Sequence, residues 1–335
     1  MYNYMGRHGL SPSGGPRIAV IGGGTGLSVI LRGLKKQTVN LSAIVTVTDD
    51  GGGSGVIRDE LGILPPGDIR SCILALADDE DIMEDLLQYR FKEGSLKGQN
   101  MGNLILAGLT EIIGDFEAAV YKLQDILRIK GQVIPVTKDD ATLCALLKDG
   151  TLVRGESYIP LEVKKHSSPI DRVFLDPAEP EALSSAVEAI TSADMIILGP
   201  GSLYSSIIPN LLVKGIKEAI QNAGGIKTLM CNVMTQEGET DHFTVSQYAR
   251  TIEKYLGKGV IENMLINNYQ YKDDVIRPYL NLGMSQMMAT DKDRDLLLAM
   301  NITPIESNMI TIDQGVVRHD ADRVASIIMS LLHES

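Results

Sequence analysis

The chain lacks several features on which small secreted proteins and membrane proteins depend. Its three cysteines, Cys72, Cys144 and Cys231, stand far apart among 335 residues and form no CxxC pair, so neither a disulfide framework nor a zinc site is indicated. No apolar run approaches the roughly 18 residues of a membrane-spanning helix. Tryptophan is absent, and aromatic residues make up only 4% of the chain. We expect a cytoplasmic protein with a core of aliphatic side chains.

Basic residues are in the minority. The chain has 31 Lys and Arg against 43 Asp and Glu, which gives a formal net charge of -12. Non-specific binding to nucleic acid requires a basic surface, and an anionic membrane repels an acidic protein on average. We therefore expect no nucleic-acid partner and no integral membrane contact.

Alternating apolar patterns predict the organisation of the chain. Residues 1–16 contain no apolar segment and are interpreted as a flexible N-terminal arm. Residues 17–335 alternate short apolar runs with helical periodicity. This alternation predicts a single α/β domain with a Rossmann-like, three-layer, doubly wound and mostly parallel sheet. Period-two alternation around Asp149-Gly150 predicts a hairpin and a small β insertion at about residues 139–175.

A glycine-rich loop follows the first apolar run, residues 17–21. The dinucleotide pattern G-x-G-x-x-G, started at Gly22, requires a glycine where Leu27 stands, and the Walker pattern has no match. Glycines nevertheless let the backbone approach a ligand, and the helix after them directs free N–H groups at it. Phosphate or nucleotide contact is favoured over a plain strand–helix turn. The predicted contacts are Gly22, Gly23, Gly24, Thr25 and Gly26.

A second strand-to-helix junction has a similar composition. The apolar run at residues 194–198 enters Gly-Pro-Gly and then a helix start with three serines. Backbone N–H groups and hydroxyls can donate to phosphate oxygens without adding charge, whereas ordinary capping would account for only one serine. The predicted anion contacts are Gly199, Pro200, Gly201, Ser202, Ser205 and Ser206.

Asp49 and Asp50 follow the second apolar run and precede four glycines in five residues. An acidic residue at this position can accept a hydrogen bond from a ribose hydroxyl. Two carboxylates beside phosphates repel them unless the carboxylates bind Mg²⁺ or face hydroxyl donors. The alternative is a solvated turn, which does not need so many glycines. Mg²⁺ is the one candidate cofactor.

Two further polar residues stand at helix starts. Arg70 lies in the first turn of a helix predicted from residue 69. A cation there interacts unfavourably with the helix dipole, so a bound anion or a carboxylate partner would explain the arginine. Asp68 is the predicted cap of that helix. Asn103 is interpreted either as an N-cap or as a ligand contact.

The later part of the chain adds candidates for the sugar or base side of a nucleotide. Asn232 and Thr235 follow another apolar run and suit sugar hydroxyls. Arg318 precedes the last predicted helix, and its planar fork suits phosphate, with a surface ion pair as the alternative. Tyr279 could offer a flat surface to uracil or to the sugar.

The ordered set of motifs resembles one family. The motifs are Gly22-Gly-Gly-Thr-Gly-Leu-Ser28, Thr48-Asp-Asp-Gly-Gly52, Pro65-Pro-Gly-Asp-Ile-Arg70, Gly102-Asn-Leu104, Gly199-Pro-Gly-Ser-Leu-Tyr204 and Cys231-Asn-Val-Met-Thr-Gln-Glu-Gly-Glu-Thr240. Together they are similar to the YvcK-type gluconeogenesis factors. These share a superfamily with CofD, the 2-phospho-L-lactate transferase of coenzyme F420 synthesis.

The resemblance implies a bacterial protein that binds UDP-N-acetylglucosamine and supports growth and cell shape on gluconeogenic carbon sources. It implies control of flux into cell-wall precursors, with glucosamine-6-phosphate synthase as a candidate partner. The two glycine loops would hold the diphosphate. Asp49 and Asp50 would match an acidic pair near the metal and the acceptor in the transferase branch. We also expect a homodimer.

Three classes of function compete. The first is a nucleotide-sugar sensor without turnover, the second a Mg²⁺-dependent CofD-like transferase of a phosphate-linked group, and the third an NAD-dependent oxidoreductase. The failed dinucleotide pattern disfavours the third. No catalytic base is evident in the sequence, which favours the sensor over the transferase and leaves enzymatic activity an open question.

Overall fold

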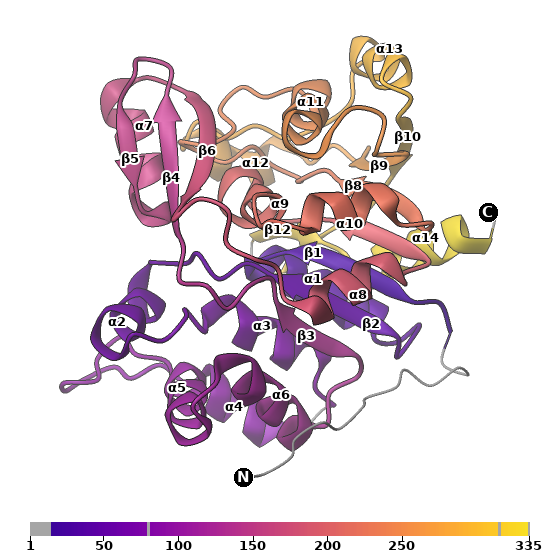
Figure 1. The fold of residues 1–335 in the computed structure, drawn as a ribbon. Helices are drawn as coiled ribbons and strands as arrows, with labels where there is room; N and C mark the ends of the chain where they lie inside the picture. Colours follow the sequence, from indigo (N-terminus) through magenta and orange to yellow (C-terminus); the bar gives the residue numbers. More distant parts are fainter. Residues whose placement is uncertain (1–14, 79–80, 314–315, 334–335) are drawn as a thin grey trace.

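The computed structural model describes residues 15–78, 81–313 and 316–333, so most of the predicted N-terminal arm lies outside the described residues. Seven parallel strands form the central sheet in the order β10-β9-β8-β7-β1-β2-β3, with β3 above the helices α4, α5 and α6 in Figure 1 and β10 at the upper right. This sheet confirms the predicted Rossmann-like α/β class. The strands are β1 (Ile18–Gly22), β2 (Leu41–Val45), β3 (Gln132–Pro135), β7 (Met195–Leu198), β8 (Ile226–Met230), β9 (Asn263–Asn267) and β10 (Thr303–Ser307).

Alternate residues of the central strands face two separate cores. In β1, Ile18 and Val20 belong to one core, whereas Ala19 and Ile21 belong to the other. All five residues of β1 are buried. A parallel sheet covered on both faces needs continuous apolar strands, which is why short apolar runs predicted these strands well.

Helices cover both faces of the sheet. The core on one face includes side chains of α1 (Gly24–Leu34), α2 (Gly52–Leu61), α3 (Gly67–Leu76), α5 (Met101–Ile113), α6 (Phe116–Leu127) and α14 (Ala321–His333). The core on the other face includes α8 (Ser184–Thr191), α9 (Ile208–Leu211), α10 (Ile216–Asn222), α11 (Val245–Leu256) and α13 (Asp291–Ala299). α14 packs against α1 so closely that a Cβ at Gly33 would overlap the carbonyl oxygen of Ala321.

The structure corrects three parts of the sequence interpretation. The glycine-rich segment after β2 contains the helix α2, and the stretch before residue 282 contains α12 (Asp273–Leu280). The helix expected to start at the three serines after Gly201 is short and is followed by a break. A π-helical turn, Leu203–Ile207, continues into α9, and α10 starts only after Gly215, whose φ of +99° a side chain would disfavour.

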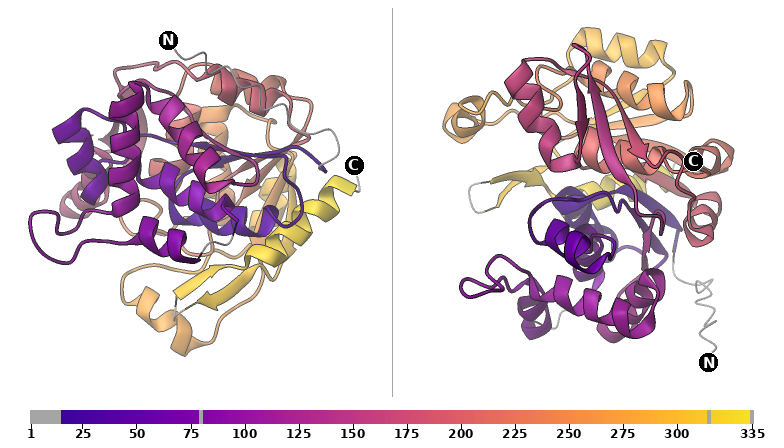
Figure 2. Two further views of the ribbon diagram at one scale, coloured as in Figure 1. Left: turned by 90° about the horizontal axis from the view of Figure 1, so that it is seen from below. Right: turned by 60° about the vertical axis from the view of Figure 1, so that its left-hand side comes forward.

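The predicted β insertion is a three-stranded antiparallel sheet of β4 (Thr142–Leu147), β5 (Leu152–Arg154) and β6 (Ile170–Asp176), in the order β5-β4-β6. A short 3₁₀ turn, Glu156–Tyr158, leads from β5 into α7 (Ile159–His166), which the sequence did not predict. A second small antiparallel pair, β11 (Ile310–Asp313) with β12 (Val316–His319), contacts α12 and lies beside it in the left view of Figure 2.

Candidate functional site

The order of the strands places both predicted phosphate loops at one point. β1 lies between β2 and β7, and the chain leads from β1 toward one edge of the sheet and from β7 toward the other. In doubly wound sheets, ligands bind at such a switch point, outside the carboxyl ends of the strands. The loop after β1 and the loop after β7 therefore leave the sheet side by side.

Glycines let these two loops pack against each other. A Cβ at Gly26 would lie 3.0 Å from the carbonyl oxygen of Pro200, and a Cβ at Gly201 would lie 3.2 Å from the carbonyl oxygen of Gly23. Gly24 has a φ of +68°, a left-handed conformation that disfavours side chains. The glycines thus serve contact between the loops as well as access to the backbone N–H groups.

The second loop is ordered by hydrogen bonds within the chain. Ser202 is the N-cap of the following turn, and its Oγ accepts from the Ser205 backbone N–H at 3.2 Å. The Asn232 side chain donates to the Gly201 carbonyl at 2.7 Å and accepts from the Gly201 N–H at 3.2 Å. Asn232, predicted to bind sugar hydroxyls, therefore also braces the loop.

Two carboxylates that were not among the predicted site residues reach the donors of these loops. Asp68 Oδ2 accepts from the Gly24 N–H at 2.6 Å. Glu239 accepts from the Ser202 hydroxyl, from the Ser205 hydroxyl at 3.2 Å and from the Tyr204 N–H at 3.4 Å. Asp68 is thus not the predicted cap of α3, whose N-cap is Pro66.

The surroundings of these carboxylates are unfavourable for negative charge. Burial, with the neighbouring Asp49, raises the pKa of Asp68 to about 7. Burial also raises the pKa of Glu239, although its hydroxyl and N–H partners oppose this. A raised pKa at a ligand site often accompanies function.

A third carboxylate with a raised pKa comes from the insertion. The Thr48 hydroxyl donates to Glu156 Oε2 at 3.2 Å. Burial and the nearby Asp49, Asp68 and Glu239 raise the pKa of Glu156 well above its usual value. The site therefore collects acidic groups from several distant segments of the chain.

Asp49 and Asp50 have different partners. Asp49 Oδ1 accepts from the Gly51 N–H at 2.9 Å, within its own turn. Asp50 Oδ1 accepts from the Ser157 N–H at 2.8 Å and so joins the β2 end to the insertion. Among the described residues, no three acidic, His or Cys side chains have the spacing of a metal site.

Arg70 and Asn103 form a pair beside the first loop. Arg70 Nε donates to Asn103 Oδ1 at 2.9 Å, and its other nitrogens donate to the Ser71 hydroxyl and the Leu87 carbonyl. Burial lowers the pKa of the Arg70 guanidinium. The N-cap of α5 is Asn100, which accepts from the Asn103 N–H at 3.1 Å, so Asn103 is not itself the cap.

Tyr279 and Arg318 belong to one small unit on the β8 side. The Tyr279 hydroxyl accepts from the Val317 N–H at 2.8 Å, next to Arg318 in β12. His319 Nε2 lies 3.3 Å from the Cys231 carbonyl at the end of β8, which sets β12 across that end. Thr235 exchanges two hydrogen bonds of 2.8 Å with Ser285 in the segment after α12.

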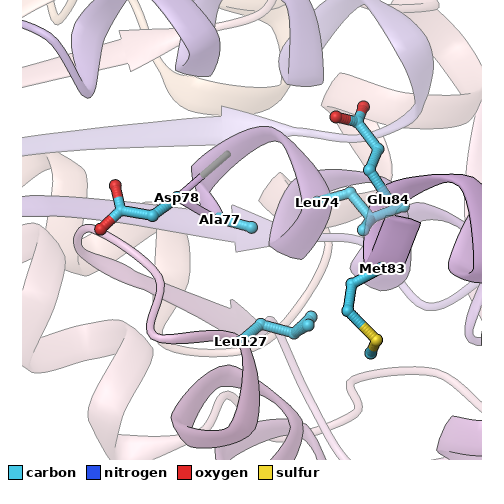
Figure 3. Close-up of a pocket in the computed structure, with 6 residues that line it drawn as sticks. All are labelled: Leu74, Ala77, Asp78, Met83, Glu84 and Leu127. Carbon is cyan, nitrogen blue, oxygen red and sulfur yellow. The ribbon is translucent and has the colours of Figure 1, made fainter. Parts of the chain in front are cut away.

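The hollow drawn in Figure 3 lies apart from this site. Its lining residues are Leu74, Ala77, Asp78, Met83, Glu84 and Leu127. They come from the C-terminal ends of α3 and α6 and from α4 (Asp81–Gln88). Asp68 stands at the opposite end of α3, so the hollow is not the site at the switch point.

Comparison with known proteins gives the family. The family described as 2-phospho-L-lactate transferase CofD matches residues 18–310. The chain belongs to the CofD family. It is 45% identical to the gluconeogenesis factor of Bacillus subtilis over 320 residues, which cover 95% of this chain and 99% of the relative. A relative from Clostridium acetobutylicum, whose name also includes gluconeogenesis factor, is 49% identical over 318 residues, 95% of this chain and 70% of the relative.

A solved structure agrees with this assignment. A crystal structure of a UPF0052 family member from Bacillus halodurans has a TM-score of 0.90 and 42% identity, and covers 94% of this chain and 100% of that one. The resemblance inferred from the ordered motifs is confirmed. The CofD match includes both glycine loops and the three carboxylates with raised pKa, Asp68, Glu156 and Glu239, whereas β12 with Arg318 lies beyond it. Within the described residues, no helix has the length and apolar character needed to cross a bilayer.

Proposed function

We propose that this CofD-family protein binds UDP-N-acetylglucosamine and acts as a regulatory protein for growth and cell morphogenesis on gluconeogenic carbon sources, through flux into cell-wall precursors. The observation that carries the proposal is the meeting of two glycine loops at the switch point of the sheet. Each loop leads into a helical turn with N–H donors, so a diphosphate that bridges them is the ligand group they suit best. The names of the relatives support the regulatory context.

The remaining parts of the ligand would lie on the β8 side of the loops. Asn232 contacts the second loop through Gly201. Its amide would therefore meet a sugar hydroxyl next to the diphosphate. Arg318 in β12 would offset the phosphate charge, and Tyr279 would offer an apolar face to uracil or sugar. Arg70 would act from α3. These assignments remain predictions for each residue.

A second candidate function is a transferase of a phosphate-linked group. The observation that favours it is the set of carboxyl groups with raised pKa, Asp68, Glu156 and Glu239. A carboxyl group with a pKa near 7 can exchange a proton near neutral pH, as general acid–base catalysis requires. The activity in the family description supports this alternative.

Phosphorus NMR of UDP-N-acetylglucosamine separates the two functions. A sensor shifts or broadens the two diphosphate signals, and no UMP or UDP accumulates with Mg²⁺ and candidate acceptors over many hours. Release of UMP or UDP that depends on the protein would support the transferase. Repeating the measurement with a chelator tests the Mg²⁺ requirement. Calorimetric titrations with GDP, NAD and phosphate in the same buffer test selectivity, and equal affinity for all four ligands would contradict the proposal.

Partners and assembly are part of the proposal. We propose a homodimer, and glucosamine-6-phosphate synthase as the protein that responds to the bound state. Sedimentation velocity with and without UDP-N-acetylglucosamine measures the first, and the expected result is the mass of two chains. Titration of the purified synthase with the protein, with and without the ligand, measures the second. If the synthase activity is the same with and without UDP-N-acetylglucosamine, the proposed partnership is contradicted.

A further inference from the structure

Each glycine loop has its donors occupied by a carboxylate of the protein itself. At the second loop, Glu239 Oε2 takes the Ser202 hydroxyl and approaches the Tyr204 N–H. Glu239 Oε1 lies 3.2 Å from the Ser205 hydroxyl, which also lies 2.6 Å from Ser202 Oγ. At the first loop, Asp68 takes the Gly24 N–H at 2.6 Å. A carboxylate oxygen, like a phosphate oxygen, is an ionised acceptor that forms charge-assisted hydrogen bonds with N–H and hydroxyl donors.

These carboxylates come from outside the loops that they occupy. Asp68 belongs to α3, 44 residues after Gly24, and Glu239 belongs to the turn after β8, 37 residues after Ser202. Among the ion pairs of the described residues, none involves either carboxylate. Burial raises the pKa of both groups, which means that their charge is poorly compensated where they lie. The donors are therefore held by acceptors that a better-suited anion can replace.

We propose that Asp68 and Glu239 are internal competitors for phosphate, so that the site rejects single phosphate ions and accepts a diphosphate that bridges both loops. This inference rests on the proposed ligand site. A lone phosphate gains the donors of one loop and is repelled by the carboxylates around it. In a diphosphate, the first group to bind brings the second to the other loop at a high effective concentration, so two weak contacts add. The two carboxylates thus lower the affinity for both ligands, but only the single phosphate becomes too weak to bind.

The turn that carries Glu239 offers a matched control. Glu237 lies two residues earlier and pairs with Lys164 of α7 at 2.7 Å, away from the serine donors. Glu237→Gln and Glu239→Gln remove the same charge from the same turn. A general effect of net charge on anion binding would therefore appear in both variants, whereas a competitor effect would appear only in Glu239→Gln.

The experiment is calorimetric titration of both variants and the wild type with inorganic phosphate, inorganic pyrophosphate and UDP-N-acetylglucosamine. We expect Glu239→Gln to bind phosphate and pyrophosphate at least threefold more tightly than wild type. Glu237→Gln should stay within twofold of wild type. The preference for pyrophosphate over phosphate should fall in Glu239→Gln, and Glu239→Ala should show the same direction of change if the glutamine partly retains the acceptor. Thermal melts confirm that each variant folds.

If Glu239 only stabilised the loop, Glu239→Gln would not bind phosphate or pyrophosphate more tightly than wild type. Equal or weaker binding of both inorganic probes by folded Glu239→Gln and Glu239→Ala would overturn the inference, as would no binding of pyrophosphate to any variant. The proposed function fails separately. Another outcome is that pyrophosphate binds more tightly to Glu239→Gln while UDP-N-acetylglucosamine binds neither the wild type nor a variant. That result would support the inference about Glu239 and contradict the proposed nucleotide-sugar ligand.

Discussion

At the scale of single residues, Asp49 and Asp50 are adjacent in sequence but have different hydrogen-bond partners. Asp50 holds the insertion through the Ser157 N–H. We expect Asp50→Ala to lower the free energy of unfolding by about 1 kcal/mol, because one hydrogen bond to a charged acceptor is lost. Asp50→Asn should recover most of this, since its amide oxygen can still accept. Urea unfolding of the two variants checks the prediction, and equal stability of both would contradict it.

Asp68 makes folding depend on pH. Its pKa of about 7 lies above the unfolded value near 3.8, so the folded state binds the proton more tightly. Its contribution to stability is fully present below about pH 4 and is lost as pH rises through 7. We expect the wild type to lose stability relative to Asp68→Asn between pH 5 and pH 8. Chemical unfolding at several pH values measures this, and a constant difference between the proteins would contradict it.

The glycine loops could be predicted from sequence because each is a local pattern of strand, glycines and helix start. The carboxylates that complete the site could not. Glu156 reaches Thr48 across 108 residues, and Glu239 reaches Ser202 across 37. The residue pattern of one segment does not predict which distant side chain will accept hydrogen bonds from its N–H and hydroxyl groups. Asp68 was noticed only as a helix cap, because capping is the local use of an aspartate at a helix start.

At the scale of elements, two helical glycines should respond in opposite directions to alanine. A Cβ at Gly33 in α1 would overlap the Ala321 carbonyl of α14, whereas a Cβ at Gly108 in α5 meets nothing within 4 Å. We expect Gly33→Ala to cost about 1–3 kcal/mol of unfolding free energy by separating the helices. Gly108→Ala should gain about 0.5–1 kcal/mol, because alanine favours the helix. Urea denaturation of both variants measures this pair, and the same sign for both would contradict the packing described.

The apolar runs at residues 17–21 and 194–198 predicted β1 and β7 to within about a residue, because burial on both faces of the sheet imposes apolar runs. The elements that were missed lacked that signal or had a weaker one. α2 begins with glycines, which have poor helix propensity. α13 did have a signal, since Thr290 and Asp293 form a capping box at its start. That pattern, Thr-x-x-Asp, would have located the helix without any knowledge of its packing.

At the scale of the whole molecule, net charge should govern how the ligand arrives. The chain carries a formal charge of -12, and a nucleotide diphosphate is also negative. Repulsion at long range slows association, and salt screens it beyond about 10 Å at 0.1 M. We expect the association rate of UDP-N-acetylglucosamine to rise between 20 mM and 200 mM salt. Stopped-flow fluorescence of a labelled ligand checks this, with uridine as the uncharged control.

A rate that falls with salt would contradict this expectation and would mean that basic side chains dominate the approach. Uridine should show no dependence of its association rate on salt. The two ligands share the base and ribose, so their difference isolates the charge of the diphosphate.

The pairing of β1 with β7 has a consequence for synthesis on the ribosome. Ile18 lies beside Met195 in the sheet, so the two glycine loops meet only when more than half of the chain has been made. At about 5–20 residues per second, β1 waits roughly ten seconds or longer for its second neighbour. The turn with Glu239 emerges later, and α14, which covers α1, later still. Until β7 has been made, the nascent chain therefore lacks the two-loop site. Its first βαβ unit must persist on the pairing of β1, β2 and β3 and on the packing of the helices made before β7.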